Sequence, residues 1–405
     1  MDSQINAAAL ALCAGDPLSA LQRVALRDDP PALALRGIAM GQLGELERAK
    51  QLLERAARSF GAREPRARAR CRLAQAEIAL AARDASGLGT SLDRPRRALE
   101  ALGDRVNAAH ARCLEVRRCL LLGHVARARA ELDALDLDGA PAMLVAVGEL
   151  LRAAVALRAL RSETARAAIE RADAAARRAQ IPALLAEVDA LRRALAMPAA
   201  RLVSAAGERS LRLAEVEALL ASPAFIVDAC RRGVRAKVNV SLARRPVLFS
   251  LARALAEAWP SGASRELLIE RAFGARRAND SHRARLRVEM GRLRRAIAAL
   301  ARVEATPEGF GLEPLGAREV CVLAPPLDHE HADVLALLAD GERWSSSALS
   351  LALGKGQRSI QRALQTLQDE AQIRCLGDGR SRRWLASPIG GFATVLLLPA
   401  SLPLD

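Results

Sequence analysis

The sequence has no tyrosine, and its few other aromatic residues lie largely in the second half of the chain. All three tryptophans and five of the six phenylalanines follow residue 220. The first 200 residues are rich in Ala, Leu, Arg and Glu, have helical periodicity and contain almost no runs of β-branched residues. This change in composition predicts a boundary between domains near Pro198–Ser210.

Cysteine pairs, a leader segment and long apolar runs are also missing. The seven cysteines form no CxxC pair and are odd in number, which argues against a disulfide framework. The N-terminus has no basic leader region, and the longest apolar runs, such as Phe392–Pro399, are too short to span a bilayer. We therefore expect a cytoplasmic protein with reduced thiols and no membrane contact.

Motifs of catalytic and cofactor sites are absent, since the sequence contains no HExxH, P-loop or GxGxxG. No Ser/His/Asp or Cys/His constellation is visible either. His329 and His331 flank an acidic residue in DHEHAD, but this spacing at a helix start does not direct both imidazoles to one ion. We therefore expect neither an enzyme nor a cofactor or metal site.

The net charge of the sequence is +15, and nearly all of its basic residues are arginines. Such a charge favours an anionic partner, either nucleic acid or an acidic membrane surface. The alternative is an arginine-rich, solvated surface of the kind that a GC-rich genome encodes. The positions of the arginines are therefore more informative than their number.

Pairs of helices are predicted to repeat in residues 1–200. In each copy, small residues stand where two helices would approach closely, and large apolar residues lie between them. The repeated positions are Gly37, Gly44, Ala49, Leu53 and Ala56 in the first copy, Gly123, Ala128 and Leu132 in the second, and Ala165, Ile169 and Ala172 in the third.

This pattern resembles the tetratricopeptide repeat, although its spacing is irregular and the usual aromatic residues are missing. The resemblance implies a helical-repeat domain over residues 1–200. Two roles remain open for this domain: a concave surface that binds a protein or peptide, or a scaffold or dimerisation module.

From residue 224 onward, short β-type runs are followed by helices in quick succession. The helix after Ser264 is expected to start at this N-cap and to end at Gly274. The other predicted elements are strands at Ala224–Cys230 and Gly233–Val240, helices at Arg245–Trp259 and from Asp280 or Ser281 to about Arg302, and a strand–turn–strand at Val303–Leu312.

Three helices followed by a hairpin are the layout of a winged helix-turn-helix. The run SLARRPVLFSLARALAEAWPSGASRELLIERAFG (Ser241–Gly274) is similar to the effector domain of OmpR/PhoB-type response regulators. LRVEMGRLRRAI (Leu286–Ile297) resembles the recognition helix of that family, and GFGL (Gly309–Leu312) resembles its wing. The resemblance implies a DNA-binding domain over residues 210–315. Two departures are the absence of a preceding receiver domain and the acidic residues of the wing.

The recognition helix has an apolar stripe, because Leu286, Met290, Leu293 and Ile297 recur at helical spacing and are expected in the core. Arginine bonds both guanine edges and phosphates, so the other faces supply candidate DNA contacts. The alternative is a solvated basic face. The candidates are His282, Arg283, Arg285, Arg287, Arg292, Arg294 and Arg295.

A second winged helix-turn-helix is predicted in residues 320–405, with helices at His331–Ala339, Ser345–Leu353 and Gln357–Ile373 and a hairpin turning at residues 377–379. Its middle resembles the helix-turn-helix of bacterial repressors. The alternative role is dimerisation or domain packing. The Pro-rich tail, residues 387–405, is predicted to pack on a neighbour as a strand or arm. Candidate DNA contacts are Lys355, Gln357, Arg358, Ser359, Arg362, Arg380, Arg382 and Arg383.

The combined pattern predicts a mainly α chain, with a helical-repeat domain followed by two winged-helix domains. The expected function is transcriptional regulation through binding of double-stranded DNA, with the helical repeats acting as a sensor or binding a protein or peptide. The alternative is an adaptor that uses both parts for protein contacts and does not bind DNA. A homodimer is compatible with either function.

Overall fold

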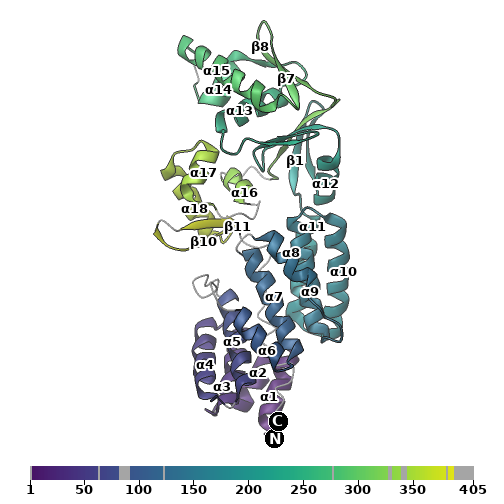
Figure 1. The fold of residues 1–405 in the computed structure, drawn as a ribbon, viewed down its shortest axis with the longest axis vertical. Coiled ribbons are helices and arrows are strands. Elements are labelled where there is room, and N and C mark those ends of the chain that lie inside the picture. The colour runs from purple at the N-terminus through teal and green to yellow at the C-terminus, as the bar shows by residue number, and fades with distance from the viewer. Residues whose placement is uncertain are drawn as a thin grey trace. The chain divides into compact units, whose positions relative to one another are not determined.

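The computed structural model describes residues 2–62, 64–81, 92–121, 124–275, 278–326, 331–338, 344–379 and 382–386. These residues form 18 helices and 11 strands (Figure 1), which confirms the expectation of a mainly helical chain with smaller sheets. The chain divides into two compact units, one mainly of Met1–Ala159 and Glu163–Leu195 and the other of Leu160–Ser162 and Ala196–Ser387. No described helix is long and apolar enough to cross a membrane.

The first unit is built from helices, and most of them pack against their neighbours in sequence. Asp16 and Asp29 begin two of these helices, since each carboxylate accepts a hydrogen bond from the N–H group three residues later, at 3.0 and 3.2 Å. The helices are α1 (Ser3–Cys13), α2 (Pro17–Val24), α3 (Pro30–Gln42), α4 (Leu46–Ser59), α5 (Pro65–Ala81), α6 (Asp93–Ala101), α7 (Arg105–Leu121), α8 (Val125–Asp133), α9 (Ala142–Arg158), α10 (Ser162–Ala179) and α11 (Pro182–Ala196).

Gly37, a small residue of the first predicted repeat, lies at a close contact between two helices. A Cβ atom at Gly37 would be only 2.8 Å from Cγ of Leu53, so glycine lets α3 and α4 approach. Gly44 has a φ angle of +85° in the turn between these two helices. Gly123 lies outside the described residues, and the resemblance to the tetratricopeptide repeat stays a prediction. Burial is confirmed at Ala49, Leu53, Ala56, Ala128, Leu132, Ala165, Ile169 and Ala172.

The second unit combines three sheets with seven helices among its described residues. Its elements are β1 (Ala200–Ser204), β2 (Gly207–Leu211), α12 (Leu213–Ala221), β3 (Phe225–Asp228), β4 (Gly233–Arg235), β5 (Asn239–Ser241), α13 (Pro246–Glu257), β6 (Ala263–Ser264), α14 (Arg265–Phe273), α15 (Asp280–Ile297), β7 (Ala301–Ala305), β8 (Gly309–Pro314), β9 (Val320–Ala324), α16 (Ala332–Leu338), α17 (Ser346–Leu353), α18 (Gln357–Asp369), β10 (Ile373–Leu376) and β11 (Arg383–Ala386).

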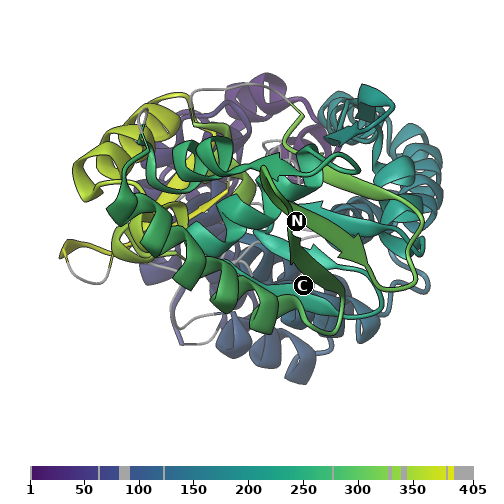
Figure 2. The ribbon, with the colours of Figure 1, turned by 90° about the horizontal axis from the view of Figure 1, so that it is seen from above.

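The largest sheet has the strand order β2-β1-β9-β3-β4-β5, and Figure 2 shows the ribbon of the chain from above. All of its pairings are antiparallel except β3 with β9. The two central strands, β9 and β3, are buried along their whole length. Since alternate residues of a strand point to opposite sides, both faces of these strands are covered. Phe225 and Val322 join the core beneath α13, whereas Ile226 and Cys321 join the core beneath α12.

In chain order, strands β1–β5 are followed by the helices α13, α14 and α15 and by the β7–β8 hairpin. Strand β6 connects α13 to α14 and pairs with β8, so the sheet order β6-β8-β7 ties the hairpin to the helices. Ser264 caps α14 by accepting the N–H of Leu267 at 3.2 Å, and Gly274 ends the helix with a φ angle of +68°. Both predicted caps are confirmed.

The last described segment has its own small core. Helices α16, α17 and α18 and the β10–β11 hairpin contribute Val334, Leu349, Leu364 and Trp384 to it. The predicted order of three helices and a hairpin is confirmed for the described residues. The tail, residues 387–405, lies outside them.

Several predicted boundaries are corrected. Asn279, rather than Asp280 or Ser281, caps α15, because its extended backbone lets its side chain accept the N–H of His282 at 2.9 Å. The helix ends at Ile297, since Ala301–Ala305 must pair with β8. Similarly, α18 ends before Ala371, whose φ angle of +56° reverses the chain into β10.

Sequence periodicity did not identify several elements of the large sheet. The run Gly233–Val240 is divided between two antiparallel strands, β4 and β5. Strands β1 and β2 and helix α12 occupy residues around the predicted boundary near Pro198–Ser210. Strand β9 lies after residue 315 but pairs with β1 and β3, so this sheet continues beyond that predicted domain end.

None of the seven cysteines, all of which lie among the described residues, forms a disulfide, and most are buried. Burial raises the pKa of the Cys113 and Cys321 thiols to about 12. A thiol of this kind is poorly nucleophilic, because the reactive species is the thiolate. These cysteines therefore act as small apolar side chains.

Candidate nucleic-acid interface

Helix α15 presents an apolar stripe to the core and a basic surface to solvent. Leu286, Met290, Leu293 and Ile297 are all buried, as predicted. Each residue turns an α-helix by about 100°, so a side chain two positions from a buried one points away from the core. Val288 lies two positions from both Leu286 and Met290, and Arg295 lies two positions from both Leu293 and Ile297. The helix carries six arginines and two carboxylates, and the exposed surface is therefore strongly positive.

Arg287 and Arg295 are the two arginines of α15 whose side chains are least engaged by the protein. Both are exposed. Arg287 forms no hydrogen bond or ion pair with another described residue, and Arg295 reaches only the carbonyl of Gly291 in its own helix, at 3.4 Å. These guanidinium groups therefore retain nearly all of their donors for an external anion.

Two other arginines of α15 pair with carboxylates of the same helix. Arg292 donates to Glu289 at 2.7 Å, and Arg283 lies 3.5 Å from Asp280. Both arginines are at least half exposed, so these pairs contribute little to stability. Their remaining N–H groups can still contact an anion.

Arg285 and His282 pack against Phe273 at the end of α14. The guanidinium carbon of Arg285 lies 4.5 Å from the ring centroid, and the imidazole of His282 stacks on the same ring at 6.3 Å. His282 is half-buried, whereas Arg285 is exposed. The two side chains hold the start of α15 against α14, and only Arg285 retains an open side.

Arg294 has a structural role in the hairpin. Its Nε donates to the carbonyl of Val303 in β7 at 2.6 Å, and its guanidinium carbon lies 5.7 Å from the ring of Phe310. Arg265 of α14 fixes the hairpin tip by donating to the carbonyls of Thr306 and Pro307 at 3.1 and 2.6 Å. An Arg294 variant would therefore disturb the hairpin as well as the helix surface.

The tip of the hairpin is acidic, as the sequence indicates. Glu304 and Glu308 are exposed there. Repulsion between these carboxylates and phosphate groups disfavours close contact of the tip with a nucleic-acid backbone. The positive charge that favours nucleic-acid binding in this segment is therefore on α15.

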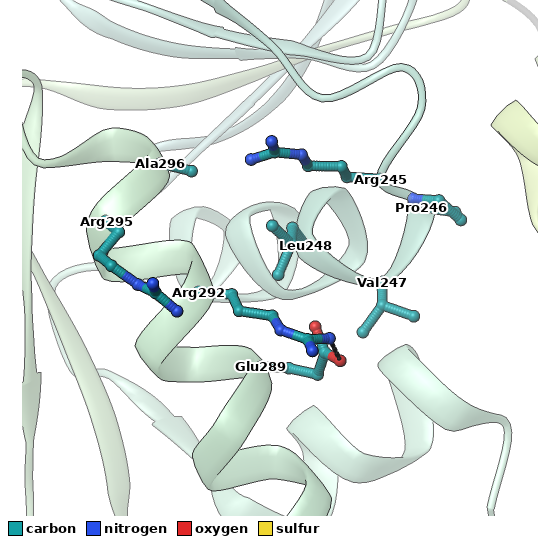
Figure 3. Close-up of a pocket in the computed structure, with 8 residues that line it drawn as sticks. All are labelled: Arg245, Pro246, Val247, Leu248, Glu289, Arg292, Arg295 and Ala296. Atoms are coloured by element: carbon teal, nitrogen blue, oxygen red, sulfur yellow. Dashed lines mark hydrogen bonds and ion pairs between the residues drawn. The ribbon is translucent and has the colours of Figure 1, made fainter.

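A hollow opens beside α15, at the start of α13 (Figure 3). Arg245 lies on its rim, across from Arg292 and Arg295. Sequence reasoning missed Arg245 because it placed this residue at the start of another helix, outside the predicted recognition helix. The adjacent Pro246 at the first helical position was a usable signal for its place at a helix end.

Val288 is a second residue that the sequence reasoning passed over. Its side chain is 55% exposed in the middle of the basic surface. A valine opposite the buried stripe has no partner in the core, so its exposure could have been inferred from the helical period. Apolar side chains at such positions contact the methyl group of thymine in DNA complexes.

The second predicted set of contacts lies largely on α18. Ile360, Ala363, Leu364 and Leu367 are buried, as predicted, and the candidate residues occupy the other faces. Lys355 forms an ion pair with Asp333 at 3.0 Å. The exposed candidates of this helix are Gln357, Arg358, Ser359 and Arg362.

The predicted basic hairpin is described only in part, because Arg380 lies outside the described residues. Arg382 is exposed, and its guanidinium carbon lies 5.9 Å from the ring of Trp384. Arg383 is half-buried and donates to the carbonyl of Arg382 at 2.9 Å. Arg382 is therefore more accessible to a ligand than Arg383.

Arg232 is a basic residue of the same unit that does not belong to the exposed surface. Burial lowers the pKa of its guanidinium to about 10, and the group lies 5.4 Å from the ring of Phe249 in α13. It remains charged at neutral pH and packs against the core beneath that helix. Arg232 therefore supports the fold.

Comparison with known proteins gave no relative for this chain. No protein-family model, no curated protein and no solved structure matches it. The functional argument consequently rests on the residues and geometry described above.

Proposed function

We propose that the chain binds double-stranded DNA through the exposed surface of α15 and acts as a transcriptional regulator. One observation carries the proposal: an arginine-rich surface lies opposite the buried stripe of the third helix in a three-helix unit that a hairpin completes. Helices placed in this way enter the major groove in winged-helix proteins. The resemblance to the OmpR/PhoB type supports the same interpretation.

The proposed division of labour follows from the chemistry of the side chains. Arg287 and Arg295 bind phosphates or guanine edges, because the described residues engage almost none of their donors. Val288 lies toward the base edges in the middle of the surface. The acidic hairpin tip stays away from the backbone, unlike the usual basic wing.

The residues of α18 form a second candidate surface of the proposed regulator. Arg358 and Arg362 are exposed on a helix that follows a short turn after α17. Gln357 suits an adenine edge, and the arginines suit phosphates. We propose that this surface adds DNA contacts to those of α15.

The alternative function is that of an adaptor that binds proteins through both units. Exposed leucines near the N-terminus favour this candidate: Leu10, Leu18 and Leu26 are 70%, 61% and 100% exposed. Large apolar side chains at a surface are typical of protein contacts when they gather into a patch. In the regulator, the same residues would serve a protein partner or a second copy of the chain.

Sequencing the genomic DNA fragments that the purified full-length chain retains distinguishes these two functions. The regulator should enrich fragments that share a short sequence motif, and two half-sites at fixed spacing would indicate a dimer. An adaptor should enrich no motif, and this result would contradict the proposal.

Substitution of Gly291 by alanine should have opposite effects on stability and on DNA binding. Glycine costs a helix interior about 0.5–1 kcal/mol relative to alanine, and a Cβ atom here would meet nothing within 4 Å. The free energy of unfolding should therefore rise by about this amount in urea denaturation. The added methyl group lies near the proposed DNA surface, so duplex affinity should fall. Affinity equal to that of the wild type would place Gly291 outside the interface.

A further inference from the structure

The hollow beside α15 is formed by two elements of the same core (Figure 3). It has a volume of about 570 Å³ and lies between the N-terminus of α13 and the second half of α15. Leu248 and Ala296 supply its apolar floor. Arg245, Arg292 and Arg295 surround it with three guanidinium groups.

The charge in this hollow is only partly compensated by the protein. Glu289 is the one carboxylate among the lining residues, and it binds Arg292 at 2.7 Å. Arg245 is exposed and forms no side-chain hydrogen bond or ion pair with the described residues. Arg295 donates only weakly, to a carbonyl of its own helix at 3.4 Å. Two guanidinium groups therefore face the hollow without a counter-charge from the described residues.

The backbone adds a smaller contribution of the same sign. Helix α13 begins at Pro246 without a side-chain cap. As in any α-helix, the N–H groups of the first turn have no acceptor within the helix, and the helix dipole places partial positive charge at this end. The guanidinium groups and this helix end together favour a compact anion with several acceptor oxygens.

We infer that the hollow binds one phosphate group of the DNA backbone when α15 lies against the duplex. This inference rests on the proposed function, because Arg295 belongs both to the exposed surface of α15 and to the hollow. Arg245 then contacts the same phosphate from α13. The backbone of one strand is held between two helices, which fixes the orientation of α15 on the duplex.

Arg245→Gln and its neighbour Arg244→Gln provide a matched pair of variants for the test. Both residues are exposed and the two variants lose the same charge, but only Arg245 lines the hollow. Binding of each full-length variant to a mixed-sequence duplex is measured by fluorescence anisotropy between about 50 and 200 mM salt. Thermal melting checks that both variants fold as the wild type does.

Arg245→Gln should weaken binding about tenfold, as expected for loss of one hydrogen bond to a charged group. The slope of log affinity against log salt should become shallower by about 0.9, since one phosphate is no longer neutralised. Arg244→Gln should change both quantities much less. Equal losses of affinity in the two variants would overturn the inference, because the overall positive charge of the protein would then explain both losses.

A titration with inorganic phosphate alone separates a free anion from a DNA phosphate. The inference is overturned if phosphate binds the wild type in an Arg245-dependent manner while Arg245→Gln binds DNA normally. It is also overturned if the wild type binds DNA and Arg245→Gln binds with the same affinity and the same salt dependence. In that case the proposed function still stands. If the wild type does not bind duplex DNA, both proposals fail.

Discussion

The double variant Arg287→Gln/Arg295→Gln should bind duplex DNA about a hundredfold more weakly than the wild type, because each lost charge-assisted hydrogen bond costs about tenfold. The protein should remain folded. Both side chains are exposed, and neither forms a hydrogen bond to another described element. Affinity is measured by fluorescence anisotropy and stability by urea denaturation.

The control for this experiment is Arg178→Gln/Arg193→Gln, which removes two exposed arginines from α10 and α11. It changes the net charge by the same amount outside the proposed interface. If the control loses as much affinity as the test variant, net charge rather than α15 determines binding. If neither variant changes affinity, the contact surface is not at Arg287 and Arg295, and the α18 residues become the next candidates.

Replacement of Gly309 by alanine should destabilise the second unit by about 3 kcal/mol, at the upper end of typical overpacking costs. Gly309 faces Ser264 where β8 pairs with β6. A Cβ atom at this position would be 1.9 Å from the carbonyl oxygen of Ala263 and 2.8 Å from its carbonyl carbon. The obstacle is backbone, which a rotamer change cannot relieve, so β8 must move away from β6.

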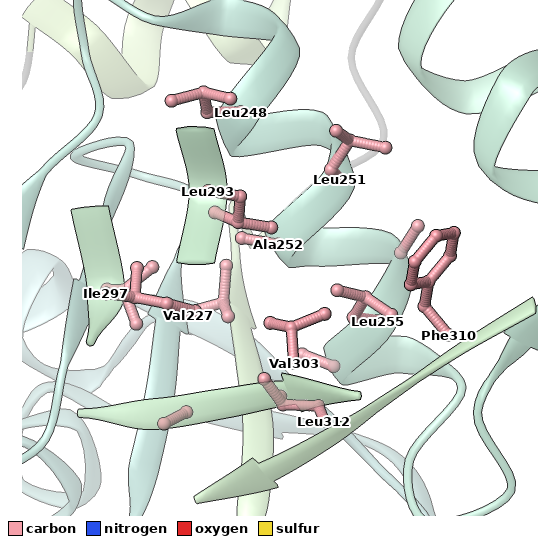
Figure 4. Packing of buried hydrophobic residues seen from close by; sticks show 14 of the residues in the cluster. Val227, Leu248, Leu251, Ala252, Leu255, Leu293, Ile297, Val303, Phe310 and Leu312 are labelled. Carbon is pink, nitrogen blue, oxygen red and sulfur yellow. The ribbon is translucent and has the colours of Figure 1, made fainter. Parts of the chain in front are cut away.

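Movement of β8 would disturb the core that positions α15 (Figure 4). Phe310 and Leu312 of β8 belong to the same buried cluster as Leu255 of α13 and Leu293 of α15. The expected result is a lower urea midpoint for this unit together with weaker DNA binding.

Gly311→Ala is the matched control for Gly309→Ala, because it adds the same methyl group to the same strand. The closest atom to a Cβ at Gly311 is Cγ2 of Thr306, at 3.8 Å, which is an ordinary contact. Stability should therefore change little. Equal destabilisation by both substitutions would show that glycine flexibility, rather than the close approach of β6 and β8, determines the effect.

Local signals predicted the elements around the candidate interface well. The Ser264 cap, the Gly274 end and the buried stripe of α15 depend on neighbouring residues within one helix. The period of the apolar residues is sufficient to assign such a stripe. The same reasoning identified the arginines of α15 as the exposed set.

Long-range pairing could not be predicted in this way. Strand β9 is a five-residue apolar run whose place between β1 and β3 depends on residues far from it in sequence. The role of Arg294 depends on the carbonyl of Val303 after the chain has turned. Arg245 lines the hollow only because α13 packs against α15. Tertiary packing, rather than periodicity, decides these three features.

The most direct test of the account is the salt dependence of duplex binding by the full-length wild-type chain. If α15 binds the backbone, log affinity should fall linearly with log salt with a slope of about −0.9 per phosphate neutralised. In Arg287→Gln/Arg295→Gln, the slope should become shallower by about 0.9 for each arginine that contacts a phosphate. Absence of duplex binding, or binding independent of salt, would contradict the account.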